Sequence, residues 1–260
     1  MESQASVDSR EPEAARSSVV LITGAAAGMG LAAAKHLVKR SHKVIAVDID
    51  GSALASAYAA YGNEQVLQLT ADISQVEQAT RSVHTGIDHF GKLNALVNNA
   101  ALHAKAWNKP CLEYSREDWL RLFGVNVFAI PTLVSAALPA LTKSGGVVVN
   151  MSSMVGYGHG HSSPYAVSKA AVNGLTVALS QELGKYGIRV VGLAPGFIAT
   201  PALLDTLDQE TQDRLISLQT MASLGTPEDI AEIMEFLISR QSRLITGTTI
   251  IADLGITRRP

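Results

Sequence analysis

The sequence predicts an α/β fold in which about seven parallel strands form one sheet, covered by helices on both faces in a doubly wound arrangement. Short β-branched runs alternate with helical stretches of about 10 to 15 residues, the pattern of βαβ crossovers. Most of these runs are apolar throughout, as expected for strands buried on both faces. Glycines and polar residues follow the ends of the runs, where a parallel sheet gathers its ligand-binding groups.

Length and composition favour a single domain over residues 18–260. The chain has 260 residues, of which 47% are hydrophobic and 17% are charged, enough to bury a sizeable core. Residues 1–17 are polar and lack the apolar stretch of a signal peptide, so we expect a disordered tail there. The sequence has no apolar run of about 18 residues, so we expect no membrane-spanning segment.

Charge and cysteine content narrow the kinds of partner. The formal net charge of −2 and the lack of a basic run favour small-molecule chemistry over binding to nucleic acid or a membrane surface. Cys111 is the only cysteine, which excludes an intrachain disulfide and a cysteine-rich metal site and fits a reducing cytoplasm. His159 and His161 lie two residues apart but lack a third ligand, so we expect no metal.

A glycine-rich turn follows the first predicted strand, residues 19–23. Gly24, Gly28 and Gly30 have the spacing G-x-x-x-G-x-G, and an alanine-rich helical pattern runs from Gly28 to about Arg40. Glycines there let the backbone approach a pyrophosphate and direct the N–H groups of the helix N-terminus toward it. Glycines also serve ordinary turns, so the trio alone is weak evidence. The order strand, glycines, helix, strand and acid predicts a Rossmann-like dinucleotide site.

The acid in this order is Asp48. It follows the second predicted strand, residues 43–47, and lies 18 residues beyond Gly30. An acid at this position can accept hydrogen bonds from the adenosine ribose hydroxyls and would repel a 2′-phosphate. The sequence therefore predicts NAD rather than NADP as the cofactor.

Two further strands are predicted at residues 65–70 and 92–97, with an amphipathic helix at residues 75–90 between them. Their carboxyl ends bring Asp72 and Asn99 to the sheet edge that carries the glycine turn. We interpret Asp72 as an acceptor for the adenine amino group. Either side chain could equally cap a helix.

A long helical region is predicted at residues 115–142, with Asn126 inside its apolar stripe. A buried amide needs hydrogen-bond partners, so Asn126 belongs either to a structural network or to a site. The fifth predicted strand, residues 147–150, brings Ser152 and Ser153 to the same sheet edge.

Tyr165 and Lys169 lie four residues apart in a predicted helix that begins near Pro164. Four residues are slightly more than one helical turn, so the phenol and the ammonium share one face. A nearby cation stabilises a phenolate and lowers the pKa of the tyrosine, which makes the pair a candidate general acid or base. The spacing alone also occurs by chance on many helices.

The remaining elements complete the sheet and add a segment at its edge. We expect strands at residues 188–193 and 247–252, and a helix at residues 227–239. Residues 194–200 form a turn after the first of these strands. Residues 201–221 have the amphipathic pattern of a flap that is mobile and closes over a bound ligand.

In this order, the motifs resemble those of the short-chain dehydrogenase/reductase family over about residues 18–255. The matching stretches are TGAAAGMG, NNAA, VVVNMSS, YAVSK, APGFIAT and TPEDIAEIMEFLIS. The resemblance implies that Tyr165 donates or accepts the proton, that Lys169 lowers its pKa and holds the nicotinamide ribose, and that Asn126 holds a water in a proton relay. It also implies a set of NAD-binding residues: Gly24, Gly28, Met29, Gly30, Asp48, Asp72, Ile73, Asn99, Ala100, Tyr165, Lys169, Pro195, Gly196, Ile198 and Thr200.

The sequence departs from the family pattern at several positions. The family usually shows NNAG where this chain has NNAA. The family serine usually lies 13 residues before the tyrosine, at Ser152, but the strand register and the pattern S-x-x-G favour Ser153, 12 residues before Tyr165. We choose Ser153 as the residue that binds the substrate oxygen and infer one residue deleted from the loop. Leu254 stands where the family commonly has the first glycine of Asp-Gly-Gly, so packing near the C-terminus is expected to differ.

The implied activity is reversible hydride transfer between NAD(H) and a secondary alcohol or ketone. Mostly apolar walls favour a hydrophobic or cyclic substrate, and the expected wall residues are Leu102, His103, Met154, Tyr157, His159, His161, Pro164, Phe197 and the flap. One alternative is an NAD-binding sensor or scaffold without turnover, and another is an epimerase or dehydratase that uses the same cofactor. The intact set of Asn126, Ser153, Tyr165 and Lys169 argues against the sensor.

The resemblance also implies a homotetramer or homodimer. Its subunits would pair through the helices around residues 115–142 and 164–185, with the C-terminal strand at a second contact. The predicted long helices carry more apolar surface than one sheet face can bury.

Overall fold

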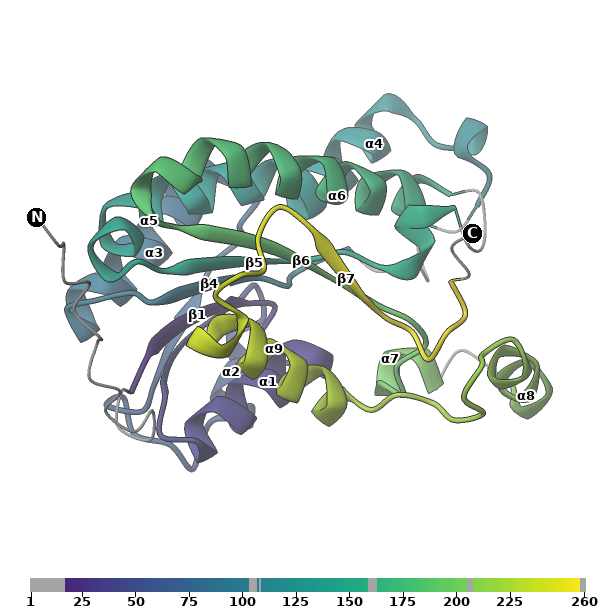
Figure 1. Cartoon of the computed structure of the whole chain (residues 1–260), viewed down its shortest axis with the longest axis horizontal. Helices are drawn as coiled ribbons and strands as arrows, with labels where there is room; N and C mark the ends of the chain where they lie inside the picture. The colour runs from purple at the N-terminus through teal and green to yellow at the C-terminus, as the bar shows by residue number, and fades with distance from the viewer. Residues whose placement is uncertain (1–16, 103–106, 108, 159–162, 205–207, 258–260) are drawn as a thin grey trace, which may run out of the picture.

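Seven parallel strands form one sheet in the order β3-β2-β1-β4-β5-β6-β7 (Figure 1). The computed structural model describes residues 17–102, 107, 109–158, 163–204 and 208–257, so nearly all of the expected tail at residues 1–17 lies outside the described part. The predicted doubly wound, Rossmann-like parallel sheet of about seven strands is confirmed. Its strands are β1 (Val19–Thr23), β2 (Lys43–Asp48), β3 (Val66–Thr70), β4 (Ala95–Asn98), β5 (Val147–Met151), β6 (Arg189–Pro195) and β7 (Thr249–Ala252).

Two strands are shorter than predicted. β4 begins at Ala95 because the preceding residues connect it to the left-handed cap of a helix at Gly91, where φ is +71°. β7 begins at Thr249 because Gly247, with φ of +68°, still belongs to the turn before the strand. Periodicity cannot locate such boundaries, since the flanking residues are also apolar or small.

The order of the strands creates a switch point between β1 and β4. β1 pairs in parallel with β2 on one side and with β4 on the other. The first three strands therefore extend the sheet in one direction, and the last four extend it in the other. In a doubly wound sheet, a crevice opens at this point outside the carboxyl ends of the strands. Thr23, Asp48 and Asn98 end their strands at this edge.

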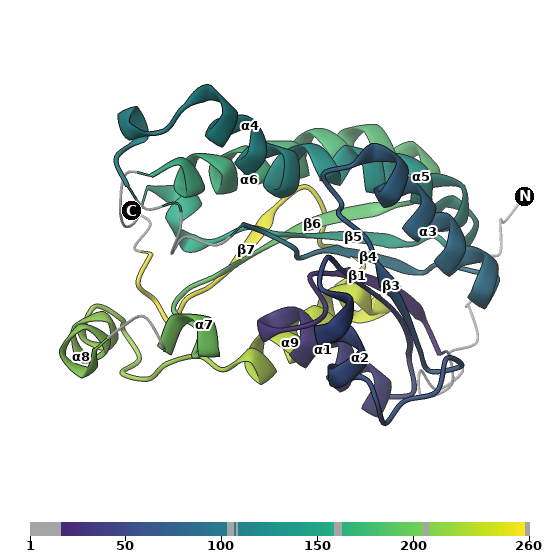
Figure 2. The ribbon, with the colours of Figure 1, turned by 180° about the vertical axis from the view of Figure 1, so that it is seen from behind.

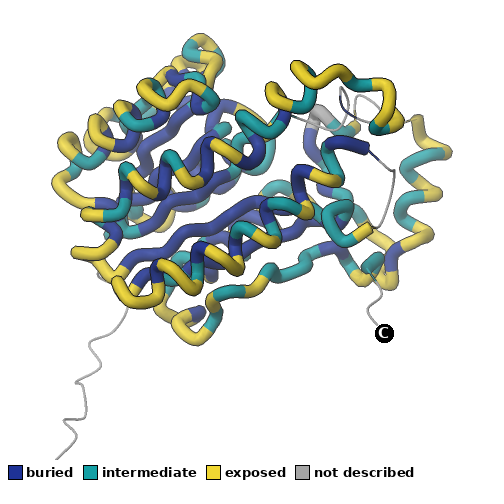
Figure 3. The backbone as a smooth tube through the Cα atoms, turned by 90° about the horizontal axis from the view of Figure 1, so that it is seen from above, coloured by how far each residue is buried: buried dark blue, intermediate teal, exposed yellow. Residues whose placement is uncertain are grey.

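Helices cover both faces of the sheet, as Figures 1 and 2 show. One face carries α1 (Gly28–Lys39), α2 (Gly51–Ala57) and α9 (Pro227–Ile238), whose apolar residues join one buried cluster. The other face carries α3 (Val76–Phe90), α5 (Ala129–Ser144) and α6 (Pro164–Leu183), which contribute to a second cluster. Figure 3 shows the strands buried between these layers and many exposed residues along the outer sides of the helices.

Helix α2 was not predicted from the sequence. It has only seven residues, too few for a clear apolar periodicity. It begins at Asp50, whose side chain accepts a hydrogen bond from the backbone N–H of Ala53 at 2.9 Å. Such a cap satisfies one of the free N–H groups of the first turn and explains why a helix starts there.

The helix predicted at residues 115–142 is continuous but not uniform. α4 (Arg116–Phe123) starts at a capping box between Ser115 and Asp118 and leads through a π-helical segment, Gly124–Phe128, into α5. A π-helical turn is wider than an α-helical turn and is often found at functional sites. It contains the buried Asn126. This widened turn leaves no mark in the apolar periodicity, so the sequence predicted a plain helix.

By length and apolar composition alone, this continuous helix, Arg116–Ser144, could cross a membrane. That finding corrects the expectation that the sequence holds no such segment. The expectation failed because scattered polar residues interrupt the apolar run without making the helix polar overall. Within the fold, Leu133, Val134 and Leu141 of this helix are buried in the cluster on one face of the sheet. This is the packing of a core helix.

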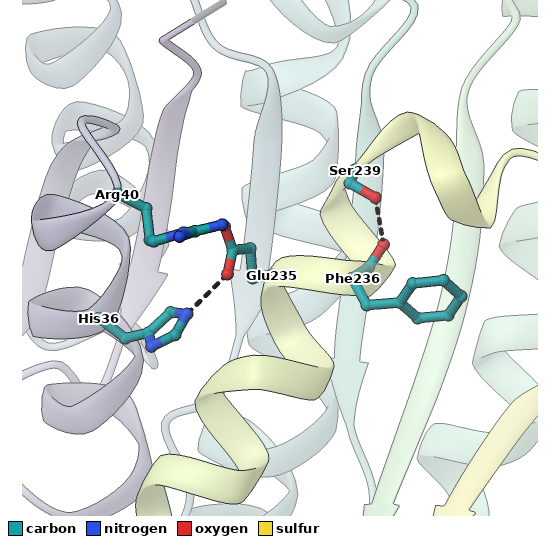
Figure 4. Close-up of polar contacts among 5 residues, drawn as sticks. All are labelled: His36, Arg40, Glu235, Phe236 and Ser239. Carbon is teal, nitrogen blue, oxygen red and sulfur yellow. Dashed lines mark hydrogen bonds and ion pairs between the residues drawn. The ribbon is translucent and has the colours of Figure 1, made fainter. Parts of the chain in front are cut away.

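A charged contact joins α1 to α9 (Figure 4). His36 Nε2 lies 2.7 Å from one carboxylate oxygen of Glu235, and Arg40 Nε donates to the other oxygen at 3.1 Å. At the end of α9, Ser239 Oγ donates to the carbonyl of Phe236 at 2.8 Å. Partly exposed ion pairs contribute less than about 1 kcal/mol, so the apolar contacts between the helices matter more to stability. The pair fixes how α9 lies against α1.

The C-terminal turn has an unusual backbone. Leu254 adopts the left-handed conformation with φ of +54°, in agreement with the expectation that this end of the chain packs differently. This conformation costs a non-glycine residue about 1 to 2 kcal/mol. The turn is held by Asp253, whose carboxylate accepts hydrogen bonds from the N–H groups of Gly255 at 3.0 Å and Thr257 at 2.8 Å.

The segment predicted as a flap, residues 201–221, contains two short helices, α7 (Pro201–Leu204) and α8 (Gln209–Ser217), and residues 205–207 lie outside the described part. α8 projects beyond the sheet in Figure 1 and buries none of its residues. The end of the segment is fixed, because the N–H groups of Thr220 and Met221 donate to the carbonyl of Leu254 at 2.9 and 3.1 Å. Closure of this segment over a ligand stays a prediction.

Candidate functional site

The three glycines of the turn after β1 have different structural reasons. A Cβ on Gly30 would lie 2.1 Å from the carbonyl oxygen of Gly24, and one on Gly24 would lie 2.8 Å from Cα of Ala100. These two glycines therefore let α1 and the end of β4 approach the turn. Gly28 has φ of +55°, and a Cβ there would meet no atom nearer than Cγ2 of Thr200 at 3.8 Å. Gly28 thus faces open space.

The N-terminus of α1 fits an anionic group. The first backbone hydrogen bond of the helix runs from Leu31 N to Ala27 O, which leaves the N–H groups of Gly28, Met29 and Gly30 without a partner inside the helix. Ala27 provides no side-chain cap, and the first turn has no acidic residue. Together with the open space at Gly28, these groups form a cradle that suits the pyrophosphate of a dinucleotide.

Asn99 holds this turn in place. Its side-chain nitrogen donates to the carbonyl of Thr23 at 2.8 Å and to that of Gly24 at 3.1 Å. Thr23 Oγ1 in turn accepts hydrogen bonds from the N–H groups of Asn99 and Ala100, each at 3.0 Å. The amide nitrogen of Asn99, predicted to contact the cofactor, is thus used within the protein. Sequence reasoning missed Thr23, which was assigned only to the strand.

Asp48 lies at the end of β2 beside the glycine turn. One carboxylate oxygen accepts from the N–H of Ala26 at 2.9 Å and the other from that of Asp50 at 3.1 Å. Behind it, the hydroxyl of Tyr58 donates to the carbonyl of Ala25 at 2.7 Å. Burial, and then the charge of Asp48, raises the pKa of Tyr58, so this hydroxyl stays protonated. A fixed negative charge therefore lies where the adenosine ribose of a dinucleotide is expected.

Asp72 and Ile73 follow β3 at the same edge. One oxygen of Asp72 accepts hydrogen bonds from the N–H of Ser74 at 2.9 Å and from its hydroxyl at 2.7 Å. This is an Asx turn just before α3, so the alternative of a local capping role has a structural basis. Ile73 is buried beside it.

Tyr165 and Lys169 lie in the first turns of α6. Ser163 caps this helix by accepting from the N–H of Ala166 at 3.4 Å, and Pro164 occupies its first position. The side chain of Ser153 forms a hydrogen bond with Tyr165. The strand register thus brings Ser153 to the phenol, as predicted from the pattern S-x-x-G.

Ser152 points elsewhere. Its hydroxyl donates to the carbonyl of Lys169 at 3.2 Å, and its N–H donates to that of Leu193 at 2.7 Å. After Ser153, a short 3-10 helix, Met154–Tyr157, packs against α6 so closely that a Cβ on Gly156 would lie 2.8 Å from the carbonyl carbon of Lys169. This close contact requires glycine and fixes the position of Ser153 relative to α6.

The expected lowering of the pKa of Tyr165 is not found among the protein's own groups. Burial raises the pKa of Tyr165 to about 12, although the hydrogen bond from Ser153 opposes the shift. Burial also lowers the pKa of Lys169 to about 8. The ammonium lies 5.6 Å from the centre of the tyrosine ring and donates to the carbonyl of Met151 at 2.6 Å. Its attraction for a phenolate is therefore smaller than the cost of burying that charge.

Asn126 belongs to a hydrogen-bond network. Its Oδ1 accepts from the N–H of Leu102 at 2.8 Å, and its Nδ2 lies 3.4 Å from the Leu102 carbonyl and 3.1 Å from Ser168 Oγ. The structural alternative considered for Asn126 is thus observed, next to the turn that carries Tyr165. Any water held by its backbone in a relay stays a prediction.

The loop after β6 lies opposite the glycine turn. The N–H of Gly196 donates to the carbonyl of Ala252 at 2.9 Å, and a Cβ on Gly196 would lie 2.7 Å from Cα of Asp253. Pro195 ends β6, and Ile198 forms a bridge with Gly225. Thr200 is buried and directs its methyl group toward Gly28. The predicted loop residues thus come together at the crevice.

Some predicted groups cannot be placed. His103, His159 and His161 of the expected substrate wall lie outside the described residues. Met154 and Pro164 of that wall are buried. Within the described ranges, no three His, Cys, Asp or Glu side chains come together as metal ligands.

Comparison with known proteins agrees with this site. Residues 24–257 match a family model described as enoyl-(acyl carrier protein) reductase. The chain is 34% identical to the (3R)-3-hydroxyacyl-CoA dehydrogenase of Canis lupus familiaris, covering 93% of this chain and 96% of that protein. It is 33% identical to the 3-oxoacyl-acyl-carrier-protein reductase of Thermotoga maritima, covering 92% and 97%.

A solved structure gives the same picture. A short-chain dehydrogenase/reductase from Brucella melitensis, titled a glucose/ribitol dehydrogenase, superposes with a TM-score of 0.86 at 30% identity, covering 93% of this chain and 97% of that one. The chain therefore belongs to the short-chain dehydrogenase/reductase family of oxidoreductases.

Proposed function

We propose that this protein is an NAD-dependent alcohol dehydrogenase or ketone reductase, which transfers a hydride reversibly between NAD(H) and a secondary alcohol or ketone. The observation that carries the proposal is the hydrogen bond between Ser153 and Tyr165, with Lys169 buried one turn further along α6. This arrangement offers two groups to one substrate oxygen and a cation near the phenol.

The chain's own residues have distinct roles in this reaction. When bound, the nicotinamide supplies or accepts the hydride at C4, and its oxidised form adds a positive charge. Ser153 holds the substrate oxygen, and Tyr165 exchanges the proton with it. Because the pKa of Tyr165 is raised to about 12, the phenol is protonated at neutral pH and ready to donate in ketone reduction. Oxidation requires the phenolate, which positive charge nearby, including that of Lys169, favours.

The substrate class is supported from two sides. The expected walls of the site are mostly apolar, which favours a hydrophobic or cyclic substrate. The relatives from Canis lupus familiaris and Thermotoga maritima are named for 3-hydroxyacyl and 3-oxoacyl thioesters. Both named groups carry a secondary alcohol or a ketone, so such thioesters belong beside cyclic alcohols in a first substrate panel.

Replacement of Tyr165 tests the proposed function directly. Tyr165→Phe removes the exchangeable proton but keeps the ring, so turnover should fall by about 100-fold or more while NADH binding stays nearly unchanged. In the wild type, kcat/KM for ketone reduction should fall as pH rises, because the phenol must be protonated, and kcat/KM for oxidation should rise. The measurement is the absorbance of reduced nicotinamide across the substrate panel.

The same assay separates the other candidates. A wild-type protein that binds NADH but turns over no substrate would support a sensor or scaffold. Substrate conversion without net change in NADH would support an epimerase or dehydratase. If Tyr165→Phe keeps more than a few per cent of the activity, Tyr165 is not the acid or base.

The two serines can be distinguished by substitution. Ser153→Ala should lower kcat about 10-fold or more, because it removes a hydrogen bond to the reacting oxygen. Ser152→Ala is the matched control: it removes a buried hydroxyl of the same size that bonds the backbone of α6. It should lower the free energy of unfolding by about 1 kcal/mol and change kcat little. The reverse ranking of kcat would contradict the assignment of Ser153.

Asp48 tests the choice of cofactor. Asp48→Asn keeps the shape of the side chain but removes the charge that would repel a 2′-phosphate, so the preference for NADH over NADPH should narrow by about 10-fold or more. Asp50→Asn, two residues away in the exposed cap of α2, should leave the preference unchanged. Dissociation constants for both cofactors provide the measurement, and a wild type that prefers NADPH would overturn the assignment.

We also propose a homotetramer, supported by exposed apolar side chains on two adjacent helical elements. Leu120, Phe128, Val167 and Val177, on α4, the π-helical segment and α6, are between 43 and 53% exposed. A second contact is supported at β7, the last strand in the sheet order, beside a cavity of about 980 Å³ lined partly by Ile250, Ile251 and Leu254.

A charge in the first surface should break the assembly. Phe128→Glu should convert the tetramer to a smaller species, since burying a carboxylate without a partner is unfavourable. Leu112→Glu is the control, because Leu112 is 99% exposed and lies outside these helices. Light scattering at micromolar concentration measures the mass, and a monomeric wild type would rule out the proposal.

A further inference from the structure

Two buried hydroxyls on α6 make the same pair of contacts at two points of the helix. Ser168 Oγ accepts from Nδ2 of Asn126 at 3.1 Å and donates to the carbonyl of Tyr165 at 2.7 Å. Thr176 Oγ1 accepts from Nδ2 of Asn150 at 3.0 Å and donates to the carbonyl of Val172 at 2.8 Å. Both residues are completely buried. Each thus links a carboxamide on a neighbouring element to the backbone of α6.

The two links end in different places. Asn150 lies in the central strand β5 and also accepts from Asn98 Nδ2 at 2.8 Å, so the Thr176 link fixes α6 to the sheet. Asn126 lies in the π-helical segment and accepts from the N–H of Leu102, so the Ser168 link reaches the loop after β4. Only the Ser168 link ends on the backbone of Tyr165.

The contact with the Tyr165 carbonyl has a geometric consequence. A serine that donates to a carbonyl three or four residues before it tilts that carbonyl and can bend the helix locally. Here the affected turn carries Tyr165 at one end and Lys169 at the other. A displacement of the reacting groups by about 1 Å can lower the rate of catalysis by about 100-fold.

We propose that Ser168 is a positioning residue, which fixes the turn of α6 that carries Tyr165 by joining it to Asn126. The proposal rests on the proposed function for its kinetic test. Ser168 acts through the backbone of Tyr165 and through the amide of Asn126, and it touches neither substrate nor cofactor. In this view the side chain of Asn126 serves the same reaction by supporting that turn from the other side.

The kinetic test compares Ser168→Ala with Thr176→Ala, which removes the equivalent link further along the same helix. Ser168→Ala should lower kcat roughly 10- to 100-fold with little change in the dissociation constant of NADH, and should shift the pH profile of ketone reduction. Thr176→Ala should keep both the kcat and the pH profile while lowering the unfolding temperature at least as much. Equal kinetic losses in the two variants would overturn the proposal, because they would indicate general loosening of α6.

A double-mutant cycle tests whether Ser168 acts through Asn126. In Asn126→Asp, the side chain keeps its size but loses the N–H groups that donate to Ser168. If both residues position the same turn, the double variant should have a kcat close to that of the slower single variant. Independent, multiplicative losses would contradict the link.

A readout independent of turnover separates this proposal from the proposed function. Protein labelled with fluorotyrosine gives a signal for Tyr165, identified by its absence in Tyr165→Phe. Ser168→Ala should shift or broaden this signal, and Thr176→Ala should leave it unchanged. An unchanged signal in Ser168→Ala would overturn the positioning role even if the wild type proves inactive, whereas an inactive wild type with a shifted signal would count only against the proposed function.

Discussion

The close approach of α1 to the end of β1 is the constraint on which the rest of the site depends. Gly30 faces the carbonyl of Gly24 at a distance that excludes any side chain, and Asn99 bonds the same carbonyl from β4. This contact aims the free N–H groups of α1 at the switch point between β1 and β4. Asp48 and Thr200 can face the same space only because the glycine turn lies flat between them.

The catalytic half of the crevice uses a different principle, the burial of polar groups that are nearly all paired. Lys169 and Ser168 are both buried on α6, and each has a partner on another element. Buried polar groups are costly when unpaired, so such a network admits few alternative arrangements of the helix. The raised pKa of Tyr165 has the same origin, since a dry site that fixes geometry also disfavours charge.

Much of this could be predicted because it depends on local rules. Strand ends, the glycine turn and the acid after β2 follow from chain order, and the register of β5 was enough to choose Ser153 over Ser152. Other features depend on tertiary contacts. The π-helical turn at Asn126 has no periodicity of its own, the side chain of Asn99 turns inward to the glycine turn, and the pKa of Tyr165 follows burial that no spacing reveals.

The C-terminal turn illustrates how a local strain can matter at a distance. Leu254 is held in a left-handed conformation by the bonds that Asp253 makes around it, and its carbonyl supports Thr220 and Met221. The last residues of the chain are therefore part of the support for the segment beside the crevice. An affinity tag fused after residue 260 would pull on this support, so a purification handle is better placed at the other end of the chain.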